Sequence, residues 1–182
     1  MALGAVWQRT VNIHTSVHPY GRGVVIIPAW KAAESSIAGA GQGIFLLEDV
    51  PRGAVLVAPT EVMDHNLLRR SAMDRFAEGS PEQQSCVRWF EDMYAVDPTW
   101  TEEALINHSF TPNGLWHLGF VFAARPIASG EELTVDYSLL MDSDEQELFR
   151  DSASGKPITG TPWPEALCRS MRALLEIFEE RQ

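Results

Sequence analysis

The chain has 182 residues, 45% of them hydrophobic and 21% charged, a balance that suffices to bury the core of one domain. No apolar run approaches the ~20 residues that span a bilayer, and no signal pattern opens the chain, so we expect an intracellular protein, cytoplasmic or, in a eukaryote, nuclear. The formal net charge of −11 disfavours direct nucleic-acid binding, because phosphates repel an acidic protein, and it favours a basic partner.

The first half of the chain predicts short strands followed by a helix. The β-branched run at 24–27 predicts a strand that ends at the following proline. Two more apolar runs, 44–47 and 54–57, are separated by a turn signal and predict adjacent strands. From 62 to 77 the apolar residues fall near helical spacing, so we expect a helix over this range.

The second half returns to strands and ends in a helix. Ser80-Pro81-Glu82-Gln83 carries the pattern of a helix start with a capping box. Runs at 118–124 and 132–135 predict strands, and apolar residues at helical spacing after 162–164 predict a C-terminal helix. Short strands interrupted by helices indicate a mainly β or α+β domain rather than a regular alternation of strands and helices.

The glycine-rich segment from Gly39 to Gly43 is the first candidate binding loop. Alternating glycines let the backbone approach a ligand closely and adopt positive φ. A nucleotide-phosphate site would need a helix after the glycines, whereas Ile44 opens a strand and no Lys-Ser or Lys-Thr follows. We therefore reject a phosphate loop, and the segment taken alone is best explained as a glycine turn between strands.

Two later motifs change that interpretation. Asn107-His108-Ser109-Phe110-Thr111-Pro112-Asn113 is followed, after one short strand and turn, by Gly130-Glu131-Glu132-Leu133-Thr134-Val135-Asp136-Tyr137. Each motif is weak evidence alone, but their order and spacing resemble those of the SET-domain protein-lysine methyltransferases. The resemblance covers a domain at 21–138, which leaves an N-terminal extension at 1–20 and a C-terminal segment at 139–182.

The resemblance implies a SET-domain fold of several small β-sheets around a pseudoknot, with inserted and C-terminal helices. It also implies that S-adenosylmethionine and a substrate lysine enter from opposite faces and meet in a narrow channel. Tyr137 matches the catalytic tyrosine of the family, and we expect it to orient the amine more than to act as a strong base. The residues that match cofactor-binding positions are Ala40, Gly41, Gln42, Gly43, Asn107, His108 and Phe149.

Three aromatic residues are candidates for the substrate channel, with core packing as the alternative for each: Tyr94, Phe110 and Trp116. Trp116 is the most informative of them. Relatives with the same Asn-His-Ser-Phe-Thr-Pro-Asn run can have a tyrosine there that tunes how many methyl groups are added. We therefore hypothesise that Trp116 changes the degree of methylation.

The chain departs from the family after Tyr137. Residues 149–160 follow the outline of the family's cysteine-rich zinc segment without a cysteine, and the two cysteines, Cys86 and Cys168, lie far apart. We therefore expect neither zinc nor another metal. Some other element must close the channel, and the candidates are Phe149, Trp163, the C-terminal helix and a second copy in a homodimer.

Three functions fit these motifs. The first is an enzyme that transfers a methyl group from S-adenosylmethionine to a lysine side chain of a basic protein. The second is a catalytically weak SET-fold module that binds the cofactor or a basic peptide. The third is a methyltransferase for a small molecule or a non-histone protein on the same scaffold, because a fold alone does not fix the substrate. Retention of Tyr137 favours the enzyme.

Overall fold

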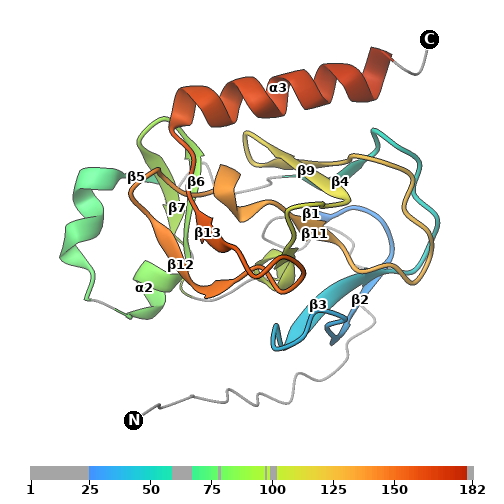
Figure 1. The fold of residues 1–182 in the computed structure, drawn as a ribbon, viewed down its shortest axis with the longest axis horizontal. Coiled ribbons are helices and arrows are strands. Elements are labelled where there is room, and N and C mark those ends of the chain that lie inside the picture. Colours follow the sequence, from blue (N-terminus) through green and yellow to red (C-terminus); the bar gives the residue numbers. More distant parts are fainter. Residues whose placement is uncertain (1–24, 59–66, 78, 97, 99–101, 180–182) are drawn as a thin grey trace.

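The computed structural model describes residues 25–58, 67–77, 79–96, 98 and 102–179, and the domain is built from several small sheets (Figure 1). The largest is a four-stranded antiparallel sheet in the order β1-β4-β10-β9. This arrangement confirms the predicted mainly β class. The strands of this sheet are β1 (Val25–Ile26), β4 (Val55–Ala58), β9 (Gly114–His117) and β10 (Phe120–Ala123).

The glycine-rich segment forms the turn of a separate hairpin. Its strands are β2 (Trp30–Glu34) and β3 (Gln42–Leu46), which pair in antiparallel register. Gly39 and Gly41 have φ values of 81° and 80°, a backbone region that residues with a Cβ adopt only under strain. Strand follows the glycines directly, as the sequence predicts.

A three-stranded sheet, in the order β5-β7-β6, corrects one prediction. The helix expected over 62–77 is replaced by strand β5 (Leu67–Arg69) and the 3-10 helix η1 (Arg70–Arg75), while 62–66 lie outside the described residues. Leu67 pairs with Ala95, so a distant strand supplies hydrogen bonds that outweigh the local helical spacing. The partner strands are β6 (Cys86–Phe90) and β7 (Met93–Val96).

The predicted helix start at Ser80 is present but short. Helix α2 (Pro81–Gln84) is a single turn, and the Ser80 side chain accepts a hydrogen bond from the backbone N–H of Gln83. The Gln83 side chain accepts from the N–H of Gly79 rather than from that of Ser80, so the capping box is only half formed. A second short 3-10 helix, η2 (Glu102–Leu105), precedes the asparagine-histidine motif.

The two signature motifs meet in a two-stranded parallel sheet. Strand β8 (Asn107–His108) pairs with β11 (Thr134–Val135), and the 3-10 helix η3 (Tyr137–Leu139) follows β11 at once. Parallel pairing needs a long connection between the partners, and the β9–β10 hairpin occupies it. This crossing of β8 and β11, called the knot below, places Tyr137 beside His108, although 29 positions separate them in the chain.

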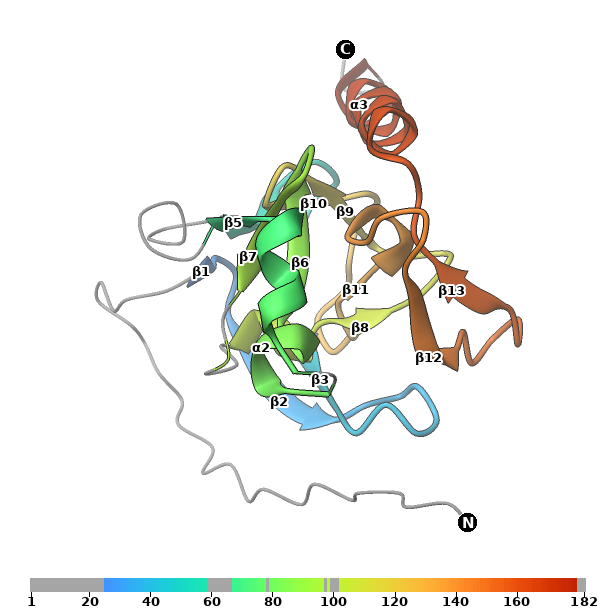
Figure 2. The same ribbon diagram turned by 90° about the vertical axis from the view of Figure 1, so that its left-hand side faces the viewer.

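The C-terminal segment forms a hairpin and a long helix. Strands β12 (Gln146–Arg150) and β13 (Pro157–Thr159) pair, and α3 (Trp163–Glu179) follows as the predicted helix. Helix α3 runs along the outer edge of the molecule (Figure 1) and projects at one end in the perpendicular view (Figure 2). Its buried positions, Ala166, Ser170 and Ile177, lie on one face.

The core lies between the four-stranded sheet, the β2–β3 hairpin and the knot. Its members are aliphatic residues, each worth about 1.5–3 kcal/mol when fully buried. The buried cluster consists of Ile26, Ile44, Leu46, Val50, Leu56, Val57, Ile106, Val121, Ala123, Ile127, Leu133 and Val135.

In the described part of the chain, no helix is long and apolar enough to cross a membrane.

Candidate functional site

A cavity of about 660 Å³ opens where the glycine loop, the knot and strand β12 meet. Its lining includes the loop segment 37–40 and, from the C-terminal segment, Glu147 and residues 149–152. Asn107, His108, Val135 and Tyr137 also line it. A cavity of this size suits a small-molecule ligand, since the volume of such sites is usually about 300–1,000 Å³.

The predicted loop residues divide into those that line the cavity and those that support it. Ala40 lines the cavity together with Gly39, whereas Gly41, Gln42 and Gly43 do not. The Gln42 carbonyl instead accepts a hydrogen bond from the Asn107 side chain, at 2.9 Å. The glycine loop is thus attached to the knot by its own backbone.

Asn107 joins the loop to a buried carboxylate. Its Nδ2 lies 2.9 Å from the Gln42 carbonyl, 2.9 Å from Glu132 Oε1 and 3.2 Å from Ser35 Oγ. Because the first two atoms are pure acceptors, they fix which end of the amide is the nitrogen. The donor end of Asn107 is therefore committed within the protein, its backbone pairs in the β8–β11 ladder, and its side-chain oxygen is the group left for a ligand.

Glu132 is a site residue that sequence reasoning did not find. Glu132 is 8% exposed and accepts hydrogen bonds from Ser35 Oγ, Ser36 N–H and Ser36 Oγ. Burial opposes its ionisation, but these hydrogen bonds and that of Asn107 bring its pKa below the usual value. A Cβ on Gly43 would collide with this carboxylate, so Gly43 is needed for close approach.

His108 presents an unused donor at the cavity wall. Its Nδ1 accepts the backbone N–H of Tyr137 at 3.1 Å, so the neutral ring carries its proton on Nε2. Burial lowers the pKa of His108, which keeps the ring neutral at physiological pH. Nε2 lies 3.8 Å from Asp151 Oδ1 and has no hydrogen-bond partner within the described residues. A buried donor without a partner is costly, and a ligand acceptor would satisfy it.

Tyr137 directs its hydroxyl at a backbone carbonyl. Its Oη donates to the oxygen of Ile106 at 2.7 Å, and its ring packs against His108 and edge-on against Phe149. Burial raises the pKa of Tyr137 well above its usual value, and the charge of Glu147 adds to this effect. The hydroxyl therefore stays protonated at neutral pH, which suits an orienting group rather than a base.

Two tryptophans line the cavity. Trp116 on β9 and Trp89 on β6 meet edge-on, with ring centroids 6.3 Å apart and planes at 82°. Gly119 permits this arrangement, because its φ is 86° and a Cβ there would lie 2.7 Å from the Trp89 ring. Trp89 was not predicted, and only its place in a half-buried strand hints at it.

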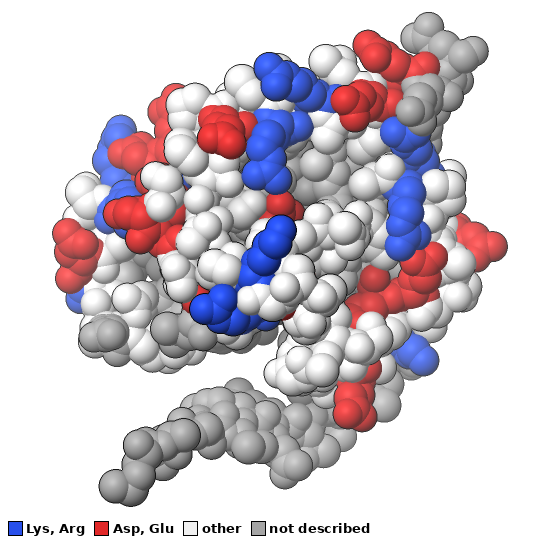
Figure 3. Space-filling model, viewed as in Figure 1, with Lys and Arg blue, Asp and Glu red and all other residues white. Residues whose placement is uncertain are grey.

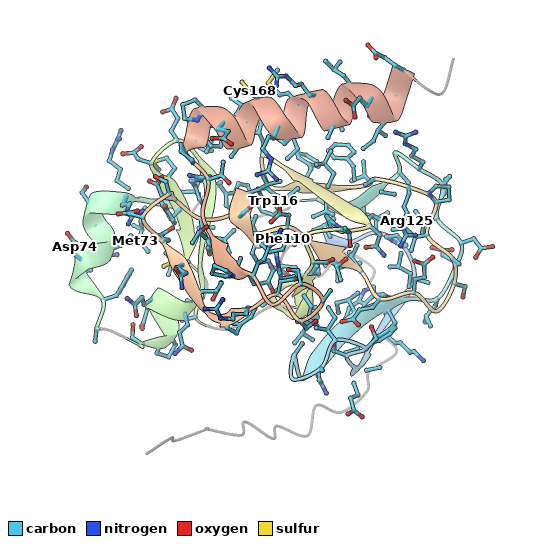
Figure 4. The ribbon with its side chains drawn as sticks, in the orientation of Figure 1. Met73, Asp74, Phe110, Trp116, Arg125 and Cys168 are labelled. Carbon is cyan, nitrogen blue, oxygen red and sulfur yellow. The ribbon has the colours of Figure 1, made fainter. Side chains whose placement is uncertain are left out.

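The other two predicted channel aromatics lie away from the cavity. Tyr94 is 2% exposed, and its hydroxyl meets Arg70 at 3.2 Å and Glu145 at 3.3 Å. Burial, followed by the charge of Glu145, raises the pKa of Tyr94 to about 12. Phe110 is 36% exposed and stands edge-on to His108. Figure 4 shows Phe110 and Trp116 in the central region between α3 and the β2–β3 hairpin, but only Trp116 lines the cavity.

The β12–β13 hairpin occupies the place of the zinc segment. Phe149, Arg150 and Asp151 line the cavity, and the Asp151 carboxylate accepts hydrogen bonds from the N–H and hydroxyl of Ser154, which fix the turn. The described residues contain no group of three or more His, Cys, Asp or Glu side chains that could hold a metal. Trp163 does not line the cavity, because its ring lies beneath the buried guanidinium of Arg88, 5.7 Å away.

Helix α3 supports the site from behind rather than covering it. Arg169 pairs with the buried carboxylate of Asp136 at 2.9 Å. Asp136 in turn caps η3 by accepting the N–H of Ser138, so it lies directly before Tyr137 and fixes the start of that turn. The helix therefore helps to position the tyrosine without lining the cavity.

The family assignment agrees with this geometry. The family model described as SET domain matches residues 41–138, more than half of the chain. The chain therefore belongs to the SET-domain family, whose members are generally S-adenosylmethionine-dependent lysine methyltransferases. A comparison with curated proteins finds no match to this chain.

Proposed function

We propose that this chain transfers a methyl group from S-adenosylmethionine to a lysine side chain of a protein. The observation that carries the proposal is one continuous cavity. It is lined at once by the glycine loop, by the Asn107-His108 pair and by Tyr137. Cofactor-binding groups and an orienting hydroxyl in one cavity are what a two-substrate transfer requires, because the reacting atoms must be held together.

The residues present fit the cofactor. The backbone at Gly39 and Ala40, the side-chain oxygen of Asn107 and the unused Nε2–H of His108 would hold its polar parts, and the exposed ring of Phe149 would cover it. When bound, S-adenosylmethionine supplies a methyl group on a positively charged sulfur. Its cationic centre is compatible with the aromatic rings of the wall, which attract cations through their faces.

The chain's own groups prepare the lysine. The rings of Trp89 and Trp116 make their part of the cavity lining apolar, and an apolar site disfavours the ammonium over the neutral amine. The Tyr137 oxygen and the Ile106 carbonyl, already in contact, would accept the N–H groups of that amine and leave its lone pair free to attack the methyl group. The same walls exclude water from the reacting atoms.

A basic protein is the substrate class that charge favours, and we place the reaction inside the cell. The net charge of −11 attracts lysine-rich partners at long range. On the face seen in Figure 3, Lys and Arg side chains alternate with Asp and Glu side chains instead of gathering in one basic patch. Such a surface gives no continuous track for a phosphate backbone.

Methyl transfer from isotope-labelled cofactor to basic proteins, read by mass spectrometry, tests the proposal. We expect transfer to lysine by the wild type and a loss of at least about 100-fold in kcat for Tyr137→Phe, the scale of a positioned catalytic group. Tyr94→Phe is the matched control, because it removes a hydroxyl that lies outside the cavity. Calorimetric binding of the cofactor without transfer to any protein would instead support the binding module.

A further inference from the structure

Strand β12 contributes a carboxylate to the cavity that the reaction described so far does not use. Glu147 lines the cavity, and within the described residues its side chain forms no hydrogen bond and no ion pair. The other charged groups of the wall are engaged. Arg150 donates to the Gly155 carbonyl, and Asp151 accepts from Ser154. Glu147 therefore differs from its neighbours in having its carboxylate available.

The surroundings of Glu147 make its carboxylate a strong attractor of a cation. Burial raises its pKa above the usual value, and the like charge of Glu145, which directly precedes the strand, adds to this. Its charge reaches the Tyr137 hydroxyl, whose pKa it raises. The remaining titratable or charged groups on the cavity wall are Glu103, which has an interaction of its own, neutral His108, Cys86, Arg150 and Asp151.

We propose that Glu147 receives the ε-ammonium group of the substrate lysine in the cavity and takes its proton. The inference rests on the proposed function, since it assigns a role in that same site. A partly buried carboxylate with no partner is unfavourable, and an incoming ammonium would neutralise it. The position fits the role, because Glu147 and the orienting hydroxyl of Tyr137 line one cavity and interact electrostatically.

The proton balance of the step is simple. One N–H bond of the ammonium breaks, its electron pair stays on nitrogen as the lone pair of the neutral amine, and the proton bonds to a carboxylate oxygen of Glu147. The charges of the ion pair thereby disappear inside the cavity. The acid then returns its proton to solvent through the open mouth, so that one proton leaves for each amine delivered.

The pKa values of the two groups move toward each other in this site. In water the reference values of lysine and glutamate differ by about 6, which forbids direct transfer. Burial raises the pKa of Glu147, and the same apolar walls lower that of an amine that enters. The transfer becomes accessible because the cavity disfavours both charged forms.

Binding of n-butylammonium, a mimic of the lysine side chain, tests the proposal without turnover. NMR of the 13C-labelled Glu147 carboxyl in the full chain should show its signal move on addition of n-butylammonium, and not on addition of 1-butanol. We expect Glu147→Gln to weaken n-butylammonium binding at least tenfold and Glu147→Asp to restore part of it. Glu165→Gln, on the exposed first turn of α3, should bind like the wild type.

Kinetics provide the second readout. The kcat/KM of the wild type should fall toward acid pH as Glu147 becomes protonated. Glu147→Gln should be slower, and its kcat/KM should change less with pH over the same acid range. Equal n-butylammonium affinity in Glu147→Gln and wild type, or an unchanged pH profile with active enzyme, would overturn the role of Glu147 and leave methyl transfer standing. Glu147-dependent n-butylammonium binding in a chain that methylates no protein would instead reject the proposed function and keep the cation site.

Discussion

Replacing Glu132 by glutamine should loosen the glycine loop and destabilise the domain. The carboxylate accepts four hydrogen bonds, from Ser35 Oγ, Ser36 N–H, Ser36 Oγ and Asn107 Nδ2. A glutamine keeps one acceptor oxygen and turns donor hydrogens toward the remaining donors, so about two charge-assisted bonds are lost. At about 1.5–3 kcal/mol each, the expected loss in the free energy of unfolding is about 3–6 kcal/mol.

The neighbouring glutamate is the matched control. Glu131 is paired at the surface with Arg125, at 2.8 Å, so Glu131→Gln should cost less than about 1 kcal/mol. Urea unfolding of both variants measures the difference, and calorimetry should show weaker cofactor binding only in Glu132→Gln. Equal shifts of the urea midpoint in the two variants would refute the idea that the Glu132 network holds the loop.

The same substitution has a defined pH signature. The pKa of Glu132 is lower in the folded chain than its ordinary value of 4.5, so its stabilisation is fully present above that value. It is lost as the pH falls through the lowered folded pKa. Glu132→Gln should therefore reduce the loss of stability in acid relative to the wild type, measured as urea midpoints against pH.

Three further predictions concern the walls of the cavity. Gly119→Ala should destabilise the domain by about 1–3 kcal/mol in urea, because the new methyl group meets the Trp89 ring at a positive φ; wild-type stability would contradict the close packing. Trp116→Tyr should change the ratio of mono-, di- and trimethyl-lysine in mass spectra, and an unchanged ratio would count against Trp116 as a channel residue. The pKa of His108 is lowered, so the free energy of unfolding should decrease as pH falls below about 6.5. His108→Asn should weaken this pH dependence, measured by urea unfolding at successive pH values.

Local pattern was enough to predict those parts of the fold whose determinants are neighbours in the chain. Alternating glycines before an apolar run predict the β2–β3 turn, because the freedom to adopt positive φ is a property of glycine itself. Apolar spacing after 162–164 predicts α3, because helical periodicity is also set by residues close together in the chain. The order and spacing of the Asn107-His108 and Tyr137 motifs indicate the SET domain, in agreement with the family match.

Only the tertiary structure decided the features that depend on distant partners. The segment 67–69 has helical spacing, yet it forms a strand because β7 offers backbone hydrogen bonds. Glu132 looks like a surface charge until the knot brings Ser36, 96 positions away, onto its carboxylate. Tyr94 and Trp89 are both aromatic residues in strands, and the side of the sheet each one faces is set by register, so only Trp89 reaches the cavity. The sequence by itself thus determined which motifs are present, and long-range pairing determined which side chains meet, because burial and hydrogen-bond partners are properties of the folded chain.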